Sequence, residues 1–401
     1  MLRPGFIAHL LLIVSIAFLA SAKAAARSTR TGKTSTASSI NESQRAQKRI
    51  ARLRHTRATR SRSTRRRRRP YERYYTSSYA DDVTGGDVTA GEDPVVRAAA
   101  IEALGNMNGT VVAIDPDSGR VLSMINQKLA LSGGAQPCST IKLAVALAAL
   151  NERIVDKDTE ITLGRRSRMN LTEALAHSNN PYFEALGRRL GFEKVSYYAH
   201  EFGLGELAGY NIPGEHLGVF PSQELAAKAG GVARMCSFGE SISMTPLQLG
   251  ALVAAMANGG TLFYLQHPSR PEEIAGFVPK VKRQLDIAPL VPEMADGMAG
   301  AVQYGTARSV RYNFSKEPVL GKTGTCSHDG TRFGWFASYA KTDRGRVVVV
   351  VFLQGGRPTF GPKAAEIAGR MYRNLYDHNF FATPSTHAQR GSQMQTVGIS
   401  E

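Results

Sequence analysis

Strand-forming segments lie at both ends of the globular part of this chain, and a long helical block separates them. Five segments carry the pattern of strands: 109–114, 121–125, 319–327, 332–339 and 346–353. The first two flank an Asp-, Pro- and Gly-containing turn at 115–120, which predicts a β-hairpin. Residues 153–310 are mostly helical by pattern. This order predicts one α+β unit, with an antiparallel sheet built from both chain ends and packed against a central helical domain.

Two further helices are expected beside this block. The segment 139–150 is apolar on all sides, so it should run through the middle of the domain. A closing helix is expected at 363–376.

The first residues, 1–26, have the form of an export signal. Arg3 provides a positive start, residues 6–20 are mostly apolar, and small residues at 20–24 offer cleavage sites. The apolar run is short for a spanning helix of about 20 residues. The segment is therefore interpreted as a signal peptide or, alternatively, an uncleaved inner-membrane anchor. Either interpretation predicts a periplasmic or otherwise extracytoplasmic protein.

The basic charge of the chain is confined to one segment. Residues 23–69 hold 17 Lys and Arg against one acid, Glu42, whereas residues 70–401 are formally neutral. We expect a disordered linker at 27–93, a globular domain at 94–378 and a loose tail at 379–401. The linker is either simply solvated or adheres to an anionic envelope polymer or lipid surface. Nucleic acid would suit the charge, but an exported chain does not meet it.

Ser139-Thr-Ile-Lys142 stands at the start of the apolar helix. Lys142 lies three residues after Ser139, on the same helical face. A desolvated lysine loses its proton near neutral pH, and the neutral amine then accepts the proton of a hydroxyl. Taken alone, the spacing also fits an ordinary helix start.

The second motif, Ser178-Asn-Asn180, follows a helical segment at 171–177, where a Ser and an Asn two apart can face one cleft. On its own it also fits a helix cap. The third motif, Lys322-Thr-Gly-Thr325, lies in a strand candidate. Alternation places its Lys and Gly on one face and its two Thr on the other, and the Gly permits close approach of a ligand backbone.

Together and in this order, the three motifs resemble those of penicillin-binding proteins and serine β-lactamases. The similarity to the transpeptidase domain of penicillin-binding proteins extends over more of the chain than the similarity to any β-lactamase, and covers roughly residues 105–375. The further similar segments are 179–183, 211–221, 237–249, 256–260, 304–307 and 334–336. The resemblance implies the α+β fold of that superfamily and an acyl-enzyme that needs neither metal nor cofactor.

The resemblance also implies catalytic roles. Ser139 would be the acylated nucleophile, Lys142 its general base and Ser178 a proton relay. The backbone N–H groups of Ser139 and Thr325 would form the oxyanion hole.

The remaining motif residues would bind the substrate. Asn180 would hold the substrate amide. Lys322, Thr323 and Thr325 would bind the terminal carboxylate, and Gly324 would let the peptide approach the strand.

The activity implied is that of a DD-transpeptidase or DD-peptidase acting on D-alanyl-D-alanine stem peptides of peptidoglycan, with β-lactams as mimics of that peptide. No folded domain is expected before the transpeptidase-like domain, so any glycosyltransferase partner would be a separate chain. The spacing from Ser139 to Ser178 is short, and Gly239-Glu240 stands where Gly-Gln is usual.

Two alternatives remain open. A β-lactamase would need a second base to activate water, and the carboxylates nearest in sequence are Glu173 and Glu215. The second alternative is a non-catalytic penicillin-binding sensor. Such a sensor normally has signalling parts, and the sequence offers no segment for them beyond its first 25 residues.

The chain has three cysteines: Cys138, Cys236 and Cys326. If Ser139 and Thr325 share an oxyanion hole, their neighbours Cys138 and Cys326 lie close together. A disulfide between them is expected in an oxidising compartment, as in carbapenem-hydrolysing class A β-lactamases, which have a similar pair. Cys236 would then be unpaired; the alternative is three buried thiols.

Overall fold

The computed structural model describes residues 72–382, apart from 165–166 and 343–344. The expected signal peptide or anchor at 1–26 lies outside the described residues. So do the linker up to residue 71 and the tail from residue 383.

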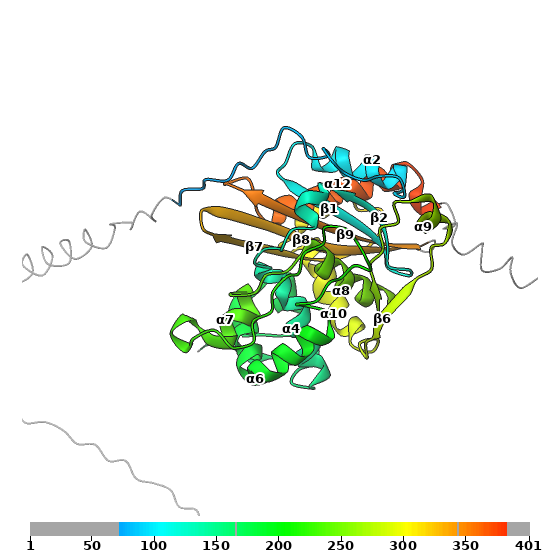
Figure 1. Cartoon of the computed structure of the whole chain (residues 1–401). Coiled ribbons are helices and arrows are strands. Elements are labelled where there is room, and N and C mark those ends of the chain that lie inside the picture. Colours follow the sequence, from blue (N-terminus) through cyan, green and yellow to red (C-terminus); the bar gives the residue numbers. More distant parts are fainter. Residues whose placement is uncertain (1–71, 165–166, 343–344, 383–401) are drawn as a thin grey trace, which may run out of the picture. The chain divides into compact units, whose positions relative to one another are not determined.

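Five strands form an antiparallel sheet in the order β2-β1-β9-β8-β7 (Figure 1). They are β1 (Gly109–Asp115), β2 (Arg120–Ile125), β7 (Val319–His328), β8 (Thr331–Thr342) and β9 (Gly345–Gly355). The early hairpin joins the late strands through β1 and β9, where Val112 lies opposite Val350. The α+β class and the pairing of the two chain ends are thereby confirmed.

The sheet has a hydrophobic core on each face, because successive residues of β9 point to opposite sides. Val348 and Val350 pack in one cluster, and Val347 and Val349 in the other. The helices α2 (Pro94–Leu104) and α12 (Gly361–Asp377) cover one face, while α8 (Pro246–Asn258) covers the other, as Figure 1 shows. The closing helix expected at 363–376 corresponds to α12.

The helical block lies on the α8 side of the sheet (Figure 1). Its helices are α4 (Lys142–Asn151), α5 (Leu171–Ala176), α6 (Asn180–Glu201), α7 (Gly231–Phe238) and α10 (Val291–Gln303). The short helix α11 (Arg308–Asn313) packs against α12 instead, and its Val310 belongs to the core on that face. Every residue from Leu143 to Leu150 is at most 5% exposed, so α4 runs through the middle, as its apolar composition predicts. The α-helix begins at Lys142 rather than Ser139, because a 3₁₀ turn, η1 (Cys138–Ile141), comes first.

The structure also contains small elements that the sequence pattern did not predict. They are two-stranded sheets of β3 (Ile161–Thr162) with β4 (Arg168–Met169) and of β5 (Thr261–Tyr264) with β6 (Lys280–Gln284), and the short helices α3 (Gln127–Ala130), η2 (Ala227–Ala229), α9 (Pro271–Ala275) and η3 (Phe380–Ala382). The sequence of β6 is mostly charged, so it lacks the apolar alternation that marks a strand. The turn η3 lies just beyond the domain end expected at residue 378.

Residues 72–93, which were expected to belong to the linker, pack along the domain. The N–H of Tyr75 donates to the carbonyl of Gly330 at 2.9 Å. Ser78 is 6% exposed, and its Oγ accepts the N–H of Gly356 at 2.7 Å. The composition predicted disorder because the segment has few large apolar side chains. Polar contacts hold it in place instead.

Two buried acids fix the end of this segment. Both Asp87 and Glu92 form ion pairs with Arg97, at 3.1 Å and 2.7 Å, and their side chains are 2% and 1% exposed. Glu92 also accepts the N–H of Met124 at 2.8 Å and contacts Nε2 of His267 at 3.1 Å. One carboxylate therefore ties the segment to β2, to α2 and to the chain after β5.

None of the helices in the described part of the chain has both the length and the apolar character needed to cross a membrane.

We predict that Glu92→Ala destabilises the domain by about 3 kcal/mol, because it removes one of the two buried carboxylates that pair with Arg97 and leaves the N–H of Met124 without its acceptor. Urea unfolding at neutral pH measures this loss. The control is Glu102→Ala, which removes an exposed acid from α2 and should change stability by less than about 0.5 kcal/mol. Equal stability of the two variants would contradict a structural role for Glu92.

Candidate active site

Three segments that are distant in sequence meet around the hydroxyl of Ser178. Lys142 Nζ lies 3.1 Å from Ser139 Oγ and 3.1 Å from Ser178 Oγ. Lys322 Nζ donates to the same Ser178 Oγ at 2.8 Å. A chain of polar contacts thus runs from the β7 lysine through Ser178 and Lys142 to Ser139.

The nucleophile candidate sits on η1, at the entry to α4. Cys138 has a positive φ of 52°, and Thr140 donates from both its N–H and its Oγ to the carbonyl of Pro137. Ser139 is half-buried and lines a cavity, whereas Lys142 is fully buried. The serine is therefore open to a ligand while the lysine is shielded from water.

The second motif lies in the turn between α5 and α6. Ser178 has a positive φ of 54°, and Asn179 caps α6 by accepting the N–H of Tyr182 at 2.9 Å. Asn180 is the first residue of α6, and its Oδ1 accepts from Lys142 Nζ at 2.6 Å. The cap therefore fixes both polar side chains of the motif next to Lys142.

Burial dominates the electrostatics of the two lysines. Burial first, and then the nearby charge of Lys322, lower the pKa of Lys142 to about 6. Burial lowers the pKa of Lys322 to about 7. Neither amine forms an ion pair with any acid in the described ranges. At neutral pH the amine of Lys142 is therefore mostly uncharged and able to accept a proton.

Strand β7 forms the opposite wall, and its side chains alternate as the sequence predicts. Lys322 points toward Ser178, while Thr323 and Thr325 line the cavity. The Oγ1 atoms of Thr323 and Thr306 are 2.6 Å apart, and Thr325 Oγ1 accepts the N–H of Gly361 at 2.7 Å.

The third residue of the motif has a steric role. A Cβ on Gly324 would lie 2.9 Å from the carbonyl oxygen of Pro137, closer than real Cβ contacts. Only glycine lets β7 approach η1 this closely.

A covalent link joins the same two walls. A disulfide connects Cys138 with Cys326, with a Cα–Cα separation of 5.5 Å, and Cys236 is a buried free thiol. The bonded cysteines directly precede Ser139 and directly follow Thr325. The link therefore holds the serine turn against the strand.

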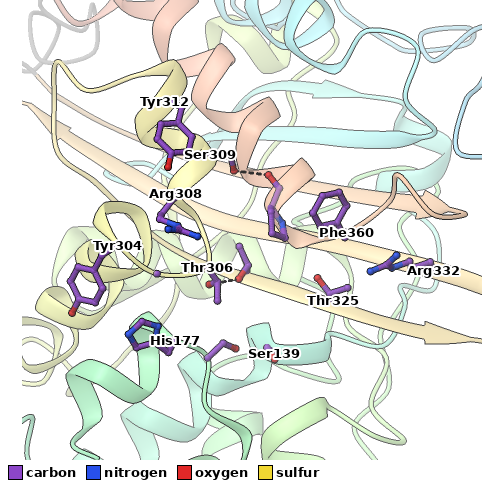
Figure 2. A pocket seen from close by; sticks show the side chains of 14 residues that line it. Ser139, His177, Tyr304, Thr306, Arg308, Ser309, Tyr312, Thr325, Arg332 and Phe360 are labelled. Carbon is purple, nitrogen blue, oxygen red and sulfur yellow. Dashed lines mark hydrogen bonds between the residues drawn. The ribbon is translucent and has the colours of Figure 1, made fainter. Parts of the chain in front are cut away.

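A cavity of about 870 Å³ opens in front of Ser139. Figure 2 shows it between the Ser139 turn below and the helix that carries Tyr312 above, with Phe360, just before α12, to the right. Besides the motif residues, the lining includes His177, Tyr304, Gly305, Thr306, Arg308, Ser309, Tyr312, Arg332, Phe360 and Pro362. Sequence reasoning assigned no role to these residues, although the segment 304–307 was noted for its similarity.

The carboxylates considered as a second base have other partners. Glu215 accepts the N–H groups of Ala208 and Gly209 at 2.9 to 3.0 Å. Burial raises the pKa of Glu215, although these hydrogen bonds oppose it. Glu173 accepts the hydroxyl of Tyr304 at 3.0 Å and pairs with His177 at 3.2 Å. Over the described ranges no group of three or more His, Cys, Asp and Glu is placed to hold a metal ion.

Curated relatives share part of this chain. It is 28% identical over 316 residues to the stage V sporulation protein D of Bacillus subtilis, covering 66% of this chain and 48% of the relative. It is 25% identical over 401 residues to the peptidoglycan D,D-transpeptidase MrdA of Acinetobacter baumannii, covering 80% and 58%. The chain thus spans about half the length of these relatives.

Solved structures share the fold. Pseudomonas aeruginosa PBP2, in complex with WCK 5153, superposes with a TM-score of 0.60 at 23% identity, covering 72% of this chain and 77% of that chain. The D,D-transpeptidase domain of a peptidoglycan glycosyltransferase from Eggerthella lenta gives 0.59 at 19% identity, covering 72% and 82%. The penicillin binding protein transpeptidase domain family matches residues 109–376, which is more than half of the chain. The chain therefore belongs to the penicillin-binding protein transpeptidase domain family.

Proposed function

We propose that this chain is a peptidoglycan D,D-transpeptidase or D,D-peptidase that works through an acyl-enzyme on Ser139. The observation that carries the proposal is the contact of 3.1 Å between Ser139 Oγ and the buried amine of Lys142, whose pKa is lowered to about 6. An uncharged amine at this distance is within reach of the hydroxyl proton.

In the proposed acylation, Lys142 takes the proton of Ser139 while Oγ attacks the peptide carbonyl. The oxyanion is stabilised by the N–H groups of Ser139 and Thr325, where one donor is commonly worth a factor of about 10² to 10³. Ser178 passes a proton to the departing amine, and its position between Lys142 and Lys322 supports this role.

The remaining motif residues position the substrate. Asn180 holds the amide of the acyl donor. Thr323 and Thr325 donate hydroxyl hydrogen bonds to its terminal carboxylate, assisted by the charge of Lys322. Gly324 keeps this wall close to the serine turn.

β-Lactams are the second class of ligand that we propose, since they carry a reactive amide and a carboxylate like the peptide. Rapid hydrolysis of the adduct would require a free second base near Ser139. Glu215 binds two backbone amides and Glu173 binds Tyr304 and His177. These contacts favour a transpeptidase over a β-lactamase.

We place the protein outside the cytoplasm, as expected for a chain that acts on peptidoglycan. The export-type sequence at 1–26 supports this location, and the +16 charge of residues 23–69 supports adhesion to an anionic envelope surface or polymer.

Incubation with a penicillin should add one penicilloyl group to Ser139, and the adduct should persist for many minutes. Intact mass over time and peptide mapping test this, with Ser139→Ala as the unreactive control. A label on another residue would refute the assignment. Loss of the label within seconds, with penicilloate accumulating, would move the protein to the β-lactamases.

The two buried lysines should differ in their effects. Lys142→Ala removes the base and should slow acylation by about 10² to 10⁴. Lys322→Ala should mainly raise the penicillin concentration needed for half-maximal acylation. Stopped-flow acylation kinetics separate the two effects, and Lys128→Ala, an exposed lysine outside the site, is the control. Near-normal acylation by the Lys142 variant would exclude it as the base.

Acylation should follow a bell-shaped pH profile. Lowering the pH through about 6 protonates Lys142 and removes the base. Raising the pH through about 7 removes the charge of Lys322 that attracts the carboxylate. The second-order rate constant for a penicillin, measured from about pH 5 to about pH 9, should therefore peak between these limits. A rate that still rises toward pH 10 would point to an ordinary lysine.

A further inference from the structure

The cavity in front of Ser139 contains two arginines that the proposed chemistry does not use. Figure 2 shows Arg308 on the Tyr304 side and Arg332 on the Phe360 side, with Thr306 and Thr325 between them. They come from separate elements, α11 and β8. Two guanidinium groups therefore face one cavity from opposite ends.

No acid balances this charge. None of the residues that line the cavity is Asp or Glu. Within the described ranges neither arginine pairs with a carboxylate: Arg332 donates to the carbonyl of Arg357 at 3.2 Å and lies 5.7 Å from the ring of Phe360. Glu173, which contacts Tyr304, is occupied by that hydroxyl and by His177. The cavity is therefore a positively charged space with free donors.

The cavity is also larger than a departing alanine requires. Its volume of about 870 Å³ falls in the range of about 300 to 1,000 Å³ typical of sites that hold a drug-sized ligand. Thr323 and Thr325, which would hold one carboxylate, line it together with Arg308. A ligand whose first carboxylate meets the two threonines has room to reach Arg308 with a second.

The position of the cavity suits the second step of the reaction, in which an acceptor amine attacks the acyl-enzyme. By microscopic reversibility, an acceptor nitrogen approaches the acyl carbon where the leaving nitrogen departed. The residue that leaves is the one whose carboxylate the threonines hold. The acceptor therefore enters this same cavity.

We propose that Arg308 is a specificity-determining residue that selects acyl acceptors carrying a second carboxylate, beyond the one next to the attacking amine. The inference rests on the proposed transpeptidase function. In the step concerned, the acceptor amine attacks the ester carbonyl of acyl-Ser139 and a C–N bond forms. The C–O bond to Oγ breaks, and the amine's proton passes by way of Lys142 to Oγ.

Competition between two matched acceptors tests the proposal. The full chain is acylated with an N-acyl-D-alanyl thioester in the presence of equal concentrations of D-glutamate and D-glutamine, and the two amide products are quantified by mass spectrometry. These acceptors share the amine and its adjacent carboxylate and differ only in side-chain charge. We expect a preference for D-glutamate of about threefold or more, which falls at high salt.

Variants then assign the preference to one side chain. Arg308→Gln should bring the product ratio close to one, and Arg308→Lys should retain part of the preference. Arg311→Gln is the matched control, because Arg311 is an exposed arginine on the same helix and does not line the cavity. Its product ratio should equal that of the wild type.

Three other results would contradict different parts of the account. A ratio near one in the wild type, or a ratio that Arg308→Gln leaves unchanged, refutes the assignment to Arg308. An acyl-enzyme that reacts only with water refutes the acceptor site and leaves the serine chemistry intact. Absence of any acyl-enzyme refutes the proposed function itself, and the inference with it.

Discussion

The site depends on the burial of two lysine amines on either side of one serine hydroxyl. Lys142 and Lys322 are both fully buried, and Ser178 Oγ lies 3.1 Å and 2.8 Å from their amines. Two buried ammonium groups this close would be costly, because each loses hydration and repels the other. The arrangement is stable when at least one amine is uncharged. An uncharged amine near Ser139 is also what a general base requires.

The fold holds this unfavourable arrangement in place from two directions. Lys142 sits at the start of α4, whose following residues are packed in the core, and Lys322 sits on β7 at the edge of the sheet. The disulfide between Cys138 and Cys326 and the close approach of β7 at Gly324 keep the two elements together. To reach water, the two amines would have to move apart, and this would require α4 to separate from the sheet. The amines therefore stay buried.

The sequence was sufficient for the sheet and for the motif residues that contact one another. The Val-rich run of β9 and the early hairpin both have strong strand patterns, and the three motifs identify the family. Beyond the sheet and the motifs, the sequence did not predict contacts that are polar or that join segments far apart in the chain. Residues 72–93 are held by buried acids such as Glu92 rather than by apolar side chains. Arg308 and Arg332 face one cavity only because the fold brings α11 and β8 to opposite ends of it.

The most direct test of the account is a titration of Lys142 itself. In protein labelled with ¹³C at the lysine side chains, the Cε and Hε shifts report the charge of each amine, and Lys142→Arg assigns the signal. We expect an inflection near pH 6, far below the value of about 10.4 for an ordinary lysine. A Lys142 signal that keeps the chemical shift of a charged amine up to pH 9 would contradict the central claim. That claim is that burial keeps the amine of Lys142 uncharged and able to act as the base.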